Sequence, residues 1–264
     1  MANKREKELA AFERLLDVLD TVREQCPWDK KQTMESLRPQ TIEETYELSE
    51  AILKKDMLDI TKELGDLLLH VVFYARIGKE LGQFDISDVC NKLCDKLIYR
   101  HPHIYGDVKV KDAEEVLGNW EQLKTKEKDG NKTVLSGVPE SLPSVIKAYR
   151  IQEKARAVGF DWEKKEDVWD KVEEELGELR QALGEGAERA KEEVGDFIFS
   201  VINASRLYGI DPDTALEDTC AKFRSRFGYV EEHTIKQGKS LKDMKLSDMD
   251  KLWNEAKNLE KKGE

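Results

Sequence analysis

The chain has 264 residues, which favours two domains of modest size because a domain averages about 150 residues. Charged residues make up 38% of it, with 55 acids against 44 bases and a formal net charge of −11. Binding to nucleic-acid backbones or anionic lipid requires a basic surface, and the longest apolar run is too short to cross a bilayer. The composition therefore excludes a nucleic-acid-coating protein, and we expect neither a nucleic-acid polymer nor a membrane as a partner.

The N-terminus alternates charged with apolar residues and lacks the uninterrupted apolar stretch of a signal peptide. The four cysteines form no CxxC pair, so we interpret them as reduced thiols. These features predict a cytoplasmic protein.

Helical periodicity runs through nearly the whole chain, beginning with the apolar stripe of Leu9, Phe12 and Leu16. A capping box at Thr41-x-x-Glu44 and the pair Asp211-Pro212 are predicted helix starts, and Gly159 and Gly209 are predicted helix ends. Sustained strand alternation is absent from the sequence. The pattern predicts an all-α protein.

Residues 129–144, with the sequence DGNKTVLSGVPESLPS, interrupt two strongly charged helical segments. We predict a linker there, between an N-terminal helical domain at 1–128 and a C-terminal helical domain at 145–264.

The two halves are related by a repeat at an offset of about 130 residues. The order of the matches is the same in both halves, which indicates a duplicated helical-bundle domain rather than coincidence. The matched segments are Glu43-Glu44-x-x-Glu47 with Glu174-Glu175-x-x-Glu178, Glu63-x-x-Asp66 with Glu193-x-x-Asp196, Lys96 to Arg100 with Lys222 to Arg226, and Trp120 to Lys124 with Trp253 to Lys257.

In each half the two acidic segments flank a short turn, at residues 54–56 and 184–186, so they predict an antiparallel helical hairpin. Residues three apart share a helix face, and the acids lie at similar distances from the turn. Four facing carboxylates repel one another unless a cation lies between them. An all-oxygen set suits Mg²⁺ or Mn²⁺, and the di-iron alternative is weaker because no His follows these acids at a spacing of three.

Basic residues accompany the acids of the second half. Lys171 and Arg189 each precede an acid by four residues, so each acidic stripe carries a cation one turn earlier. Such a stripe complements a metal bound to a triphosphate. Lys222 and Arg226 share another helix face, and Trp253 with Lys257 offers a flat surface beside a charge for a base or ribose.

The first half keeps its acids and downstream bases but has Gln40 and Asp59 where the second half has Lys171 and Arg189. An extra acid in place of a cation weakens the binding of a polyanion. We therefore predict a second, weaker metal site in the first half, formed by Glu44, Glu47, Glu63 and Asp66, with Lys96 and Arg100 downstream.

Three aromatic or histidine features are interpreted as structural. Trp28 and Trp162 precede the acidic helices and are interpreted as core residues that anchor loops. His70 lies among leucines and valines, where a hydrogen-bonded core histidine is the simpler interpretation. The Pro of Arg100-His-Pro-His103 ends a helix, and we assign that segment no chemistry.

A single Glu-x-x-Glu is most often a solvated helix face, so a non-catalytic acidic adaptor that binds a basic protein is the competing hypothesis. An adaptor explains the net charge but not the cations within the acidic stripes.

The duplicated acidic pattern, together with Cys26-Pro-Trp-Asp29, Arg100-His-Pro-His103 and Gly159-Phe-Asp-Trp162, closely resembles the MazG family of tandem-domain nucleoside triphosphate pyrophosphohydrolases. The resemblance covers essentially the whole chain. It implies an all-α Mg²⁺-dependent homodimer that hydrolyses NTPs and dNTPs to the monophosphate and pyrophosphate and removes noncanonical nucleotides. It also implies that the C-terminal domain is the principal catalytic one. A narrower dUTP-type pyrophosphatase, or one specific for a histidine-pathway intermediate, is the alternative within this chemistry.

Carried over by position, the resemblance implies a metal site and a nucleotide site in the second half. Arg189 stands where a Lys is common, which keeps the charge but changes the donor geometry. Glu174 is the candidate to orient or deprotonate water, and Lys222 with Arg226 would stabilise the departing pyrophosphate. The implied metal ligands are Glu175, Glu178, Glu193 and Asp196, and the implied nucleotide contacts are Lys171, Glu174, Arg189, Lys222, Arg226 and Trp253.

Overall fold

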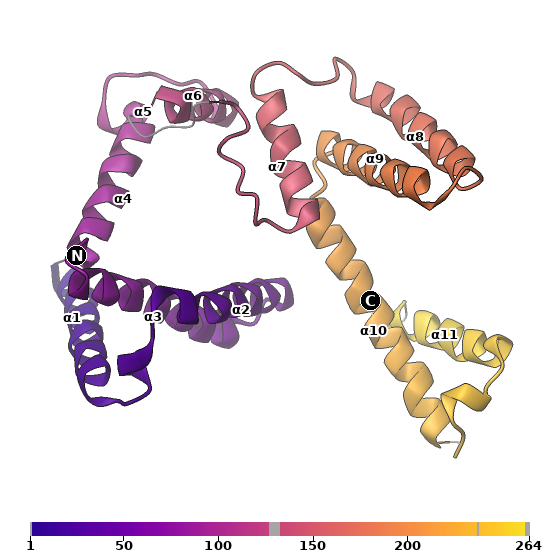
Figure 1. Cartoon of the computed structure of the whole chain (residues 1–264), viewed down its shortest axis with the longest axis horizontal. Helices are drawn as coiled ribbons and strands as arrows, with labels where there is room; N and C mark the ends of the chain where they lie inside the picture. Colours follow the sequence, from indigo (N-terminus) through magenta and orange to yellow (C-terminus); the bar gives the residue numbers. More distant parts are fainter. Residues whose placement is uncertain (1, 127–132, 237, 262–264) are drawn as a thin grey trace. The chain divides into compact units, whose positions relative to one another are not determined.

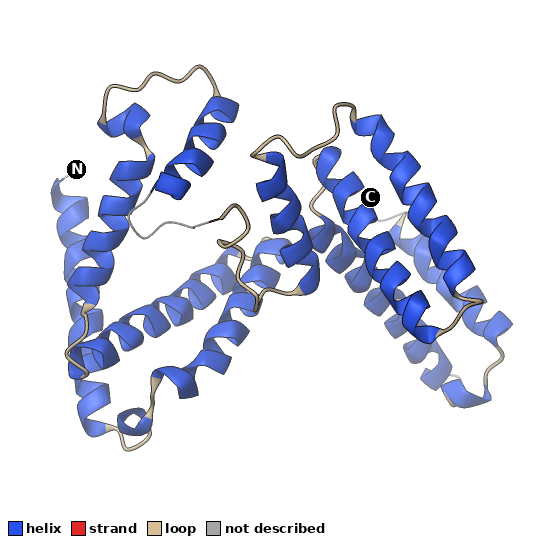
Figure 2. Ribbon diagram, turned by 45° about the horizontal axis from the view of Figure 1, so that its top comes forward, coloured by secondary structure: helices blue, strands red, loops and turns tan. Residues whose placement is uncertain are grey.

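A computed structural model describes residues 2–126, 133–236 and 238–261 (Figure 1). Its described residues form helices, turns and loops and include no strand, which confirms the predicted all-α class (Figure 2). The chain divides into two compact units, residues 1–111 and 112–264. This division falls before the linker that we placed at 129–144, part of which lies outside the described residues, so the linker and its flanking boundaries stay a prediction.

The first unit is built around a helical hairpin. Helices α2 and α3 pack against each other, and α1 and α4 pack on α3. Leu19, Leu37, Val72, Phe73 and Ile77 form its buried apolar core. The helices are α1 (Ala2–Gln25), α2 (Met34–Lys54), α3 (Met57–Glu80), α4 (Ile86–Arg100) and α5 (Pro102–Tyr105), with a 3-10 turn at Asp29–Lys31.

The second unit contains the corresponding hairpin of α8 and α9, with α7 packed on α9 and α10, and α11 packed on α10 (Figures 1 and 2). Its core includes Val168, Val172 and Ala204, with Phe197 and Leu207 packed against them. The helices are α6 (Ala113–Lys126), α7 (Ser144–Arg156), α8 (Val168–Ala182), α9 (Ala187–Leu207), α10 (Pro212–Lys236) and α11 (Leu246–Glu260), with 3-10 turns at Lys165–Asp167 and Leu241–Asp243.

Several predicted helix ends are confirmed. The carboxylate of Asp211 accepts a hydrogen bond from the backbone N–H of Thr214 at 2.7 Å, which caps α10. Gly159 and Gly209 follow α7 and α9 with φ angles of 87° and 70°, in the left-handed region that glycine adopts without strain.

The predicted helix start at Thr41 is wrong. Helix α2 begins earlier, where the capping box pairs Thr33 with Ser36, and it continues through Pro39. The Thr41 hydroxyl lies inside the helix and instead contacts His70 Nδ1 at 3.0 Å. His70 is buried, and burial lowers its pKa, so its interpretation as a hydrogen-bonded core residue is confirmed.

None of the described helices combines the length and the apolar character that crossing a bilayer requires.

Candidate metal and nucleotide site

Three acids of the second unit converge across the α8–α9 hairpin. Glu175 comes from α8, Glu193 and Asp196 come from α9, and one carboxylate oxygen of each lies within 4.8 Å of the others. Glu193 and Asp196 share a face because they are three residues apart on a helix. Glu178, one turn after Glu175, is exposed and lies outside this group, although its charge helps to raise the pKa of Glu193. Its predicted role as a ligand stays a prediction.

The cluster is short of positive charge. Glu175 and Glu193 are buried, and each leaves its Oε2 atom without a hydrogen-bond partner among the described residues. Burial raises the pKa of Glu193, Arg189 opposes the rise, and the neighbouring acids add to it. Buried carboxylates with unused oxygens fit a cation, and an all-oxygen donor set is the kind that a divalent metal ion takes.

Each predicted cation contacts an acid four residues later. Lys171 Nζ lies 2.8 Å from Glu175 Oε1 and 3.0 Å from Glu174 Oε1, and these bonds raise the pKa of Lys171 well above its usual range. Arg189 Nη2 lies 2.5 Å from Glu193 Oε1, and the Glu193 charge raises the Arg189 pKa. Both basic side chains therefore remain charged beside the cluster at neutral pH.

The predicted nucleotide residues on α10 and α11 form a separate group. Arg226 donates to Glu260 Oε2 at 2.7 and 2.9 Å, and its guanidinium lies 5.7 Å from the centre of the Trp253 ring. Lys222 and Lys257 are exposed on the same two helices. None of Lys222, Arg226, Trp253 and Lys257 lines the pocket that reaches the acids, so their contact with a nucleotide stays a prediction.

The first unit carries a related cluster of Glu44, Glu63 and Asp66, whose ligand oxygens lie within 4.8 Å of one another. Burial and the neighbouring acids raise the pKa of Glu44. The buried Glu63 pairs with Lys62 at 2.8 Å, and its Oε2 has no hydrogen-bond partner within the described part of the chain. Sequence reasoning missed Lys62, because it lies next to Glu63 in the chain and off the predicted stripe. Glu47 lies outside the group but contributes to the raised pKa of Glu44.

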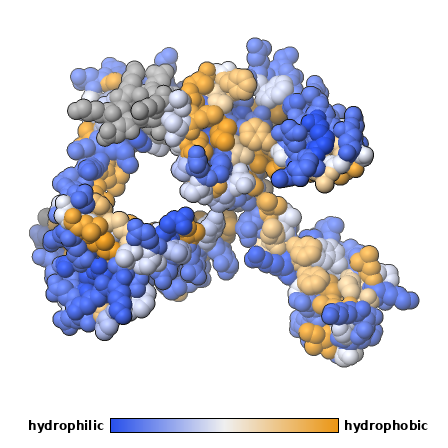
Figure 3. Space-filling model, in the orientation of Figure 1, coloured by the Kyte–Doolittle hydropathy of each residue, from blue (hydrophilic) through white to orange (hydrophobic). Residues whose placement is uncertain are grey.

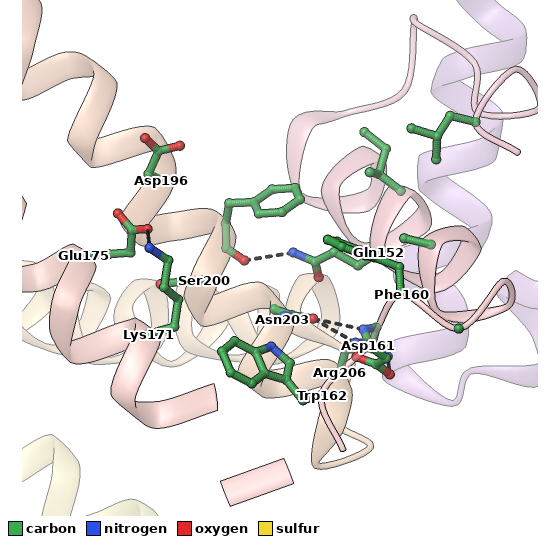
Figure 4. Close-up of a pocket in the computed structure, with 15 residues that line it drawn as sticks. Gln152, Phe160, Asp161, Trp162, Lys171, Glu175, Asp196, Ser200, Asn203 and Arg206 are labelled. Carbon is green, nitrogen blue, oxygen red and sulfur yellow. Dashed lines mark hydrogen bonds and ion pairs between the residues drawn. The ribbon is translucent and has the colours of Figure 1, made fainter. Parts of the chain in front are cut away.

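A pocket of about 580 Å³ adjoins the acids of the second unit (Figure 4). Lys171, Glu175 and Asp196 line one part of it, and α7 and the segment 159–162 line another. Most of these residues could not be predicted from the sequence as site residues, because they belong to neither acidic motif. The missed residues include Gln152, Phe160, Phe199, Ser200 and Asn203.

The interpretation of Trp28 and Trp162 as core residues is wrong. Trp28 is 55% exposed and Trp162 is 39% exposed, and Trp162 lines the pocket. A tryptophan next to an acidic helix is equally compatible with either position in the sequence pattern.

The segment 159–162 is held against α9 by an ion pair. Arg206 donates to both carboxylate oxygens of Asp161, and to Asn203 Oδ1 at 2.8 Å. Burial raises the pKa of Asp161, but the bonds from Arg206 and from the Trp162 backbone, together with the Arg206 and Arg156 charges, hold this pKa below its ordinary value. This bidentate pair positions the neighbouring aromatic residues at the pocket.

Comparison with known proteins agrees with the geometry. A profile of the MazG nucleotide pyrophosphohydrolase domain matches residues 32–105 and 163–230, one segment in each half. A nucleoside triphosphate pyrophosphohydrolase from Escherichia coli (strain K12) is 40% identical over 258 residues, which cover 94% of this chain and 98% of that protein. The chain belongs to the MazG family.

Two further relatives support the assignment to the MazG family. The nucleoside triphosphate pyrophosphohydrolase/pyrophosphatase MazG of Thermotoga maritima is 43% identical and covers 93% of this chain and 95% of its own length. The Bacillus subtilis protein YabN is 48% identical over 90% of this chain, but the match covers 49% of YabN. The MazG profile matches both halves, which supports tandem helical domains and makes the chain a member of a family of hydrolases.

Proposed function

We propose that this MazG protein hydrolyses nucleoside and deoxynucleoside triphosphates to the monophosphate and pyrophosphate in its C-terminal unit, and so removes noncanonical nucleotides. The observation that carries this proposal is the convergence of Glu175, Glu193 and Asp196, with two buried unpartnered oxygens and two adjacent cations. The full-length relatives named as pyrophosphohydrolases support the same reaction.

The proposed cofactor is Mg²⁺, with Mn²⁺ as a possible substitute, held by Glu175, Glu193 and Asp196 together with Glu178. The oxygen-only donor set supports this choice, because Mg²⁺ binds through carboxylates plus substrate phosphates. When bound, it supplies positive charge for the triphosphate and lowers the pKa of a coordinated water.

Lys171 and Arg189 are the proposed contacts to the phosphate oxygens of the substrate. In the absence of substrate each is neutralised by an acid of the cluster. With a metal held by the acids, Lys171 and Arg189 would be available to contact the phosphate oxygens. Glu174, which contacts Lys171 from the exposed side, is the proposed group that orients water or accepts its proton.

We propose that Lys222, Arg226, Trp253 and Lys257 complete the nucleotide site through self-association. These residues are grouped on α10 and α11, apart from the acids of the same chain. Figure 3 shows apolar side chains at the surface over these helices, where Phe223, Ile235 and Leu246 are exposed. Exposed apolar residues on amphipathic helices favour a homodimer.

The acidic cluster of the first unit is proposed as a weaker metal site. It has no cation at positions 40 and 59, and the opposing charge comes from Lys62 alone among the described ion pairs of the cluster. A site with fewer cations binds a polyanion less tightly, so this unit contributes less to turnover.

The proposed location is the cytoplasm, which is where nucleoside triphosphates are made and used. The four free cysteines support a reducing compartment.

The reaction is tested by incubating the full chain with Mg²⁺ and a panel of NTPs and dNTPs, and by measuring monophosphate and pyrophosphate. Release of pyrophosphate from several substrates is expected. Absence of release with every nucleotide would support the acidic adaptor, whereas release from dUTP alone would support the narrower pyrophosphatase.

A further inference from the structure

The pocket beside the acids has a polar group that the proposed chemistry does not use. Gln152 on α7 is 6% exposed, and its Nε2 donates to the backbone carbonyl of Phe199 on α9 at 2.9 Å. A carbonyl can only accept, so this bond fixes the orientation of the amide. Gln152 Oε1 is then a buried acceptor, and it has no partner among the described residues. A buried acceptor without a donor costs free energy that a ligand N–H can recover.

The surroundings of this amide have the character of a base-binding pocket. Phe160, Trp162 and Phe199 line the same space, and Phe160 is 82% exposed. Figure 4 shows Gln152, Trp162 and Asn203 around the part of the pocket away from Asp196. Ligand pockets combine aromatic walls with a few placed polar groups, and the volume of about 580 Å³ is in the usual range.

The first unit differs at the equivalent positions. When Asp66 is matched to Asp196, His70 stands in place of Ser200 and Phe73 in place of Asn203. Both are buried, and Phe73 packs into the core with Leu19 and Val72. In the first unit a buried histidine and a core phenylalanine thus occupy the two positions that line the pocket in the second unit.

We propose that this pocket binds the nucleobase of the substrate, with Phe160 and Trp162 as stacking surfaces and Gln152 Oε1 as the acceptor for a base N–H. Trp253 and Lys257 then serve the ribose rather than the base. This inference rests on the proposed function, since it places the triphosphate at Glu175 and Asp196 and the base next to them. Gln152 is then a specificity residue, because it favours bases with an N–H on the hydrogen-bonding edge. Stacking on aromatic faces is tolerant of base identity, which suits a protein that accepts several nucleotides.

The test uses α,β-methylene triphosphates, which cannot be cleaved at the α–β bond, so binding is measured independently of catalysis. Dissociation constants are measured by calorimetry with Mg²⁺ for the adenosine, inosine and purine-riboside analogues. Purine riboside has no N–H on this edge. The wild type is expected to bind the adenosine or inosine analogue about 10- to 100-fold more tightly than the purine-riboside analogue.

The decisive variant is Gln152→Leu, which keeps the side-chain volume but removes the acceptor. In this variant the dissociation constant of the purine-riboside analogue, divided by that of the adenosine or inosine analogue, is expected to fall to about one. The matched control Gln181→Leu, on the exposed face of α8, keeps the wild-type ratio. Equal affinities in the wild type, or an unchanged preference in Gln152→Leu, would overturn the proposal.

A second variant tests stacking without disturbing the core. Phe160→Ala removes an exposed side chain, so the fold is retained. It is expected to lower the affinity for every nucleoside triphosphate analogue by about ten-fold while leaving the affinity for pyrophosphate unchanged. Unaltered nucleotide binding would contradict the assignment of Phe160. If no nucleotide is hydrolysed but the preference for N–H bases persists, the proposed reaction fails and the base pocket is upheld.

Discussion

At the scale of single residues, the site depends on carboxylates that the fold buries at a cost. Glu175 and Glu193 are shielded from water and have acidic neighbours, and each has an oxygen that no described residue contacts by a hydrogen bond. Desolvated charges of one sign destabilise a metal-free protein unless something cationic offsets them. Lys171 and Arg189 offset part of this charge, and the remaining oxygens are the reason to assign a metal.

The ion pair of Asp161 with Arg206 gives a pH-dependent prediction. The pKa of Asp161 is lowered in the folded state, so the stability that it contributes is present above the unfolded pKa of about 3.9 and is lost as pH falls through the folded value. Asp161→Asn is expected to reduce the free energy of unfolding by about 2 kcal/mol at neutral pH.

Urea unfolding at several pH values measures this difference. It should shrink below about pH 4, as the wild-type carboxylate becomes protonated. A difference that stays constant down to pH 3 would show that the charge of Asp161 does not stabilise the fold.

At the scale of elements, the α8–α9 hairpin carries one cation on each helix, and the first unit lacks both. Lys171→Gln introduces the residue that the first unit has at position 40. We expect KM for a nucleoside triphosphate to rise about ten-fold because one charge-assisted phosphate contact is lost. Steady-state kinetics at saturating Mg²⁺ measures this change.

The metal site provides the control for this variant. Mg²⁺ binding, followed by calorimetry, should not weaken, because Lys171 is not a ligand and its removal frees Glu175 Oε1 from a competing cation. An unchanged KM in Lys171→Gln would remove this residue from the substrate site.

The hairpins and their acidic stripes are readable from sequence, because helical spacing alone places residues three and four apart on one face. The repeat adds a second observation: in both halves the two acidic segments flank a short turn, which places them on the two helices of one hairpin. The start of α2 is misread because Pro39 and Thr41-x-x-Glu44 resemble a helix start, while the capping box at Thr33 and Ser36 lies earlier. The sequence thus offers two helix starts of similar strength, and the structure has the earlier one.

The pocket is not readable from sequence, because it depends on elements distant in the chain. Gln152 lies on α7 and bonds to a carbonyl of α9, and Trp162 lies on the connection between α7 and α8. No spacing rule connects a lone amide to a lone aromatic residue across such a distance. The grouping of Arg226 with Trp253 and Glu260, apart from the acids, likewise follows from the packing of α11 on α10.

At the scale of the whole molecule, the two units share the same kind of helical hairpin but differ in the side chains that lie beside it. The first fills its interior with apolar residues and a buried histidine, and the second leaves a pocket next to its acids. Duplication followed by divergence of a few side chains accounts for this difference without a change of helical architecture.

Self-association is a prediction at this scale. The exposed apolar side chains on α4, α10 and α11, such as Leu93, Leu97 and Phe223, are expected to be covered in a homodimer. Light scattering coupled to size-exclusion chromatography should give twice the mass of the chain at micromolar concentration. A monomer at every concentration, with full activity, would contradict the proposal that self-association completes the site.

The most direct test compares equivalent glutamates in the two units, Glu193 and Glu63. Mg²⁺-dependent release of pyrophosphate from a nucleoside triphosphate is measured for the wild type, Glu193→Gln and Glu63→Gln, each checked for folding by circular dichroism. Glu193→Gln is expected to lose at least about 100-fold in kcat/KM, because a metal ligand is removed, whereas Glu63→Gln keeps most of the activity. Full Mg²⁺-dependent activity in Glu193→Gln would contradict the assignment of the catalytic metal to the C-terminal unit.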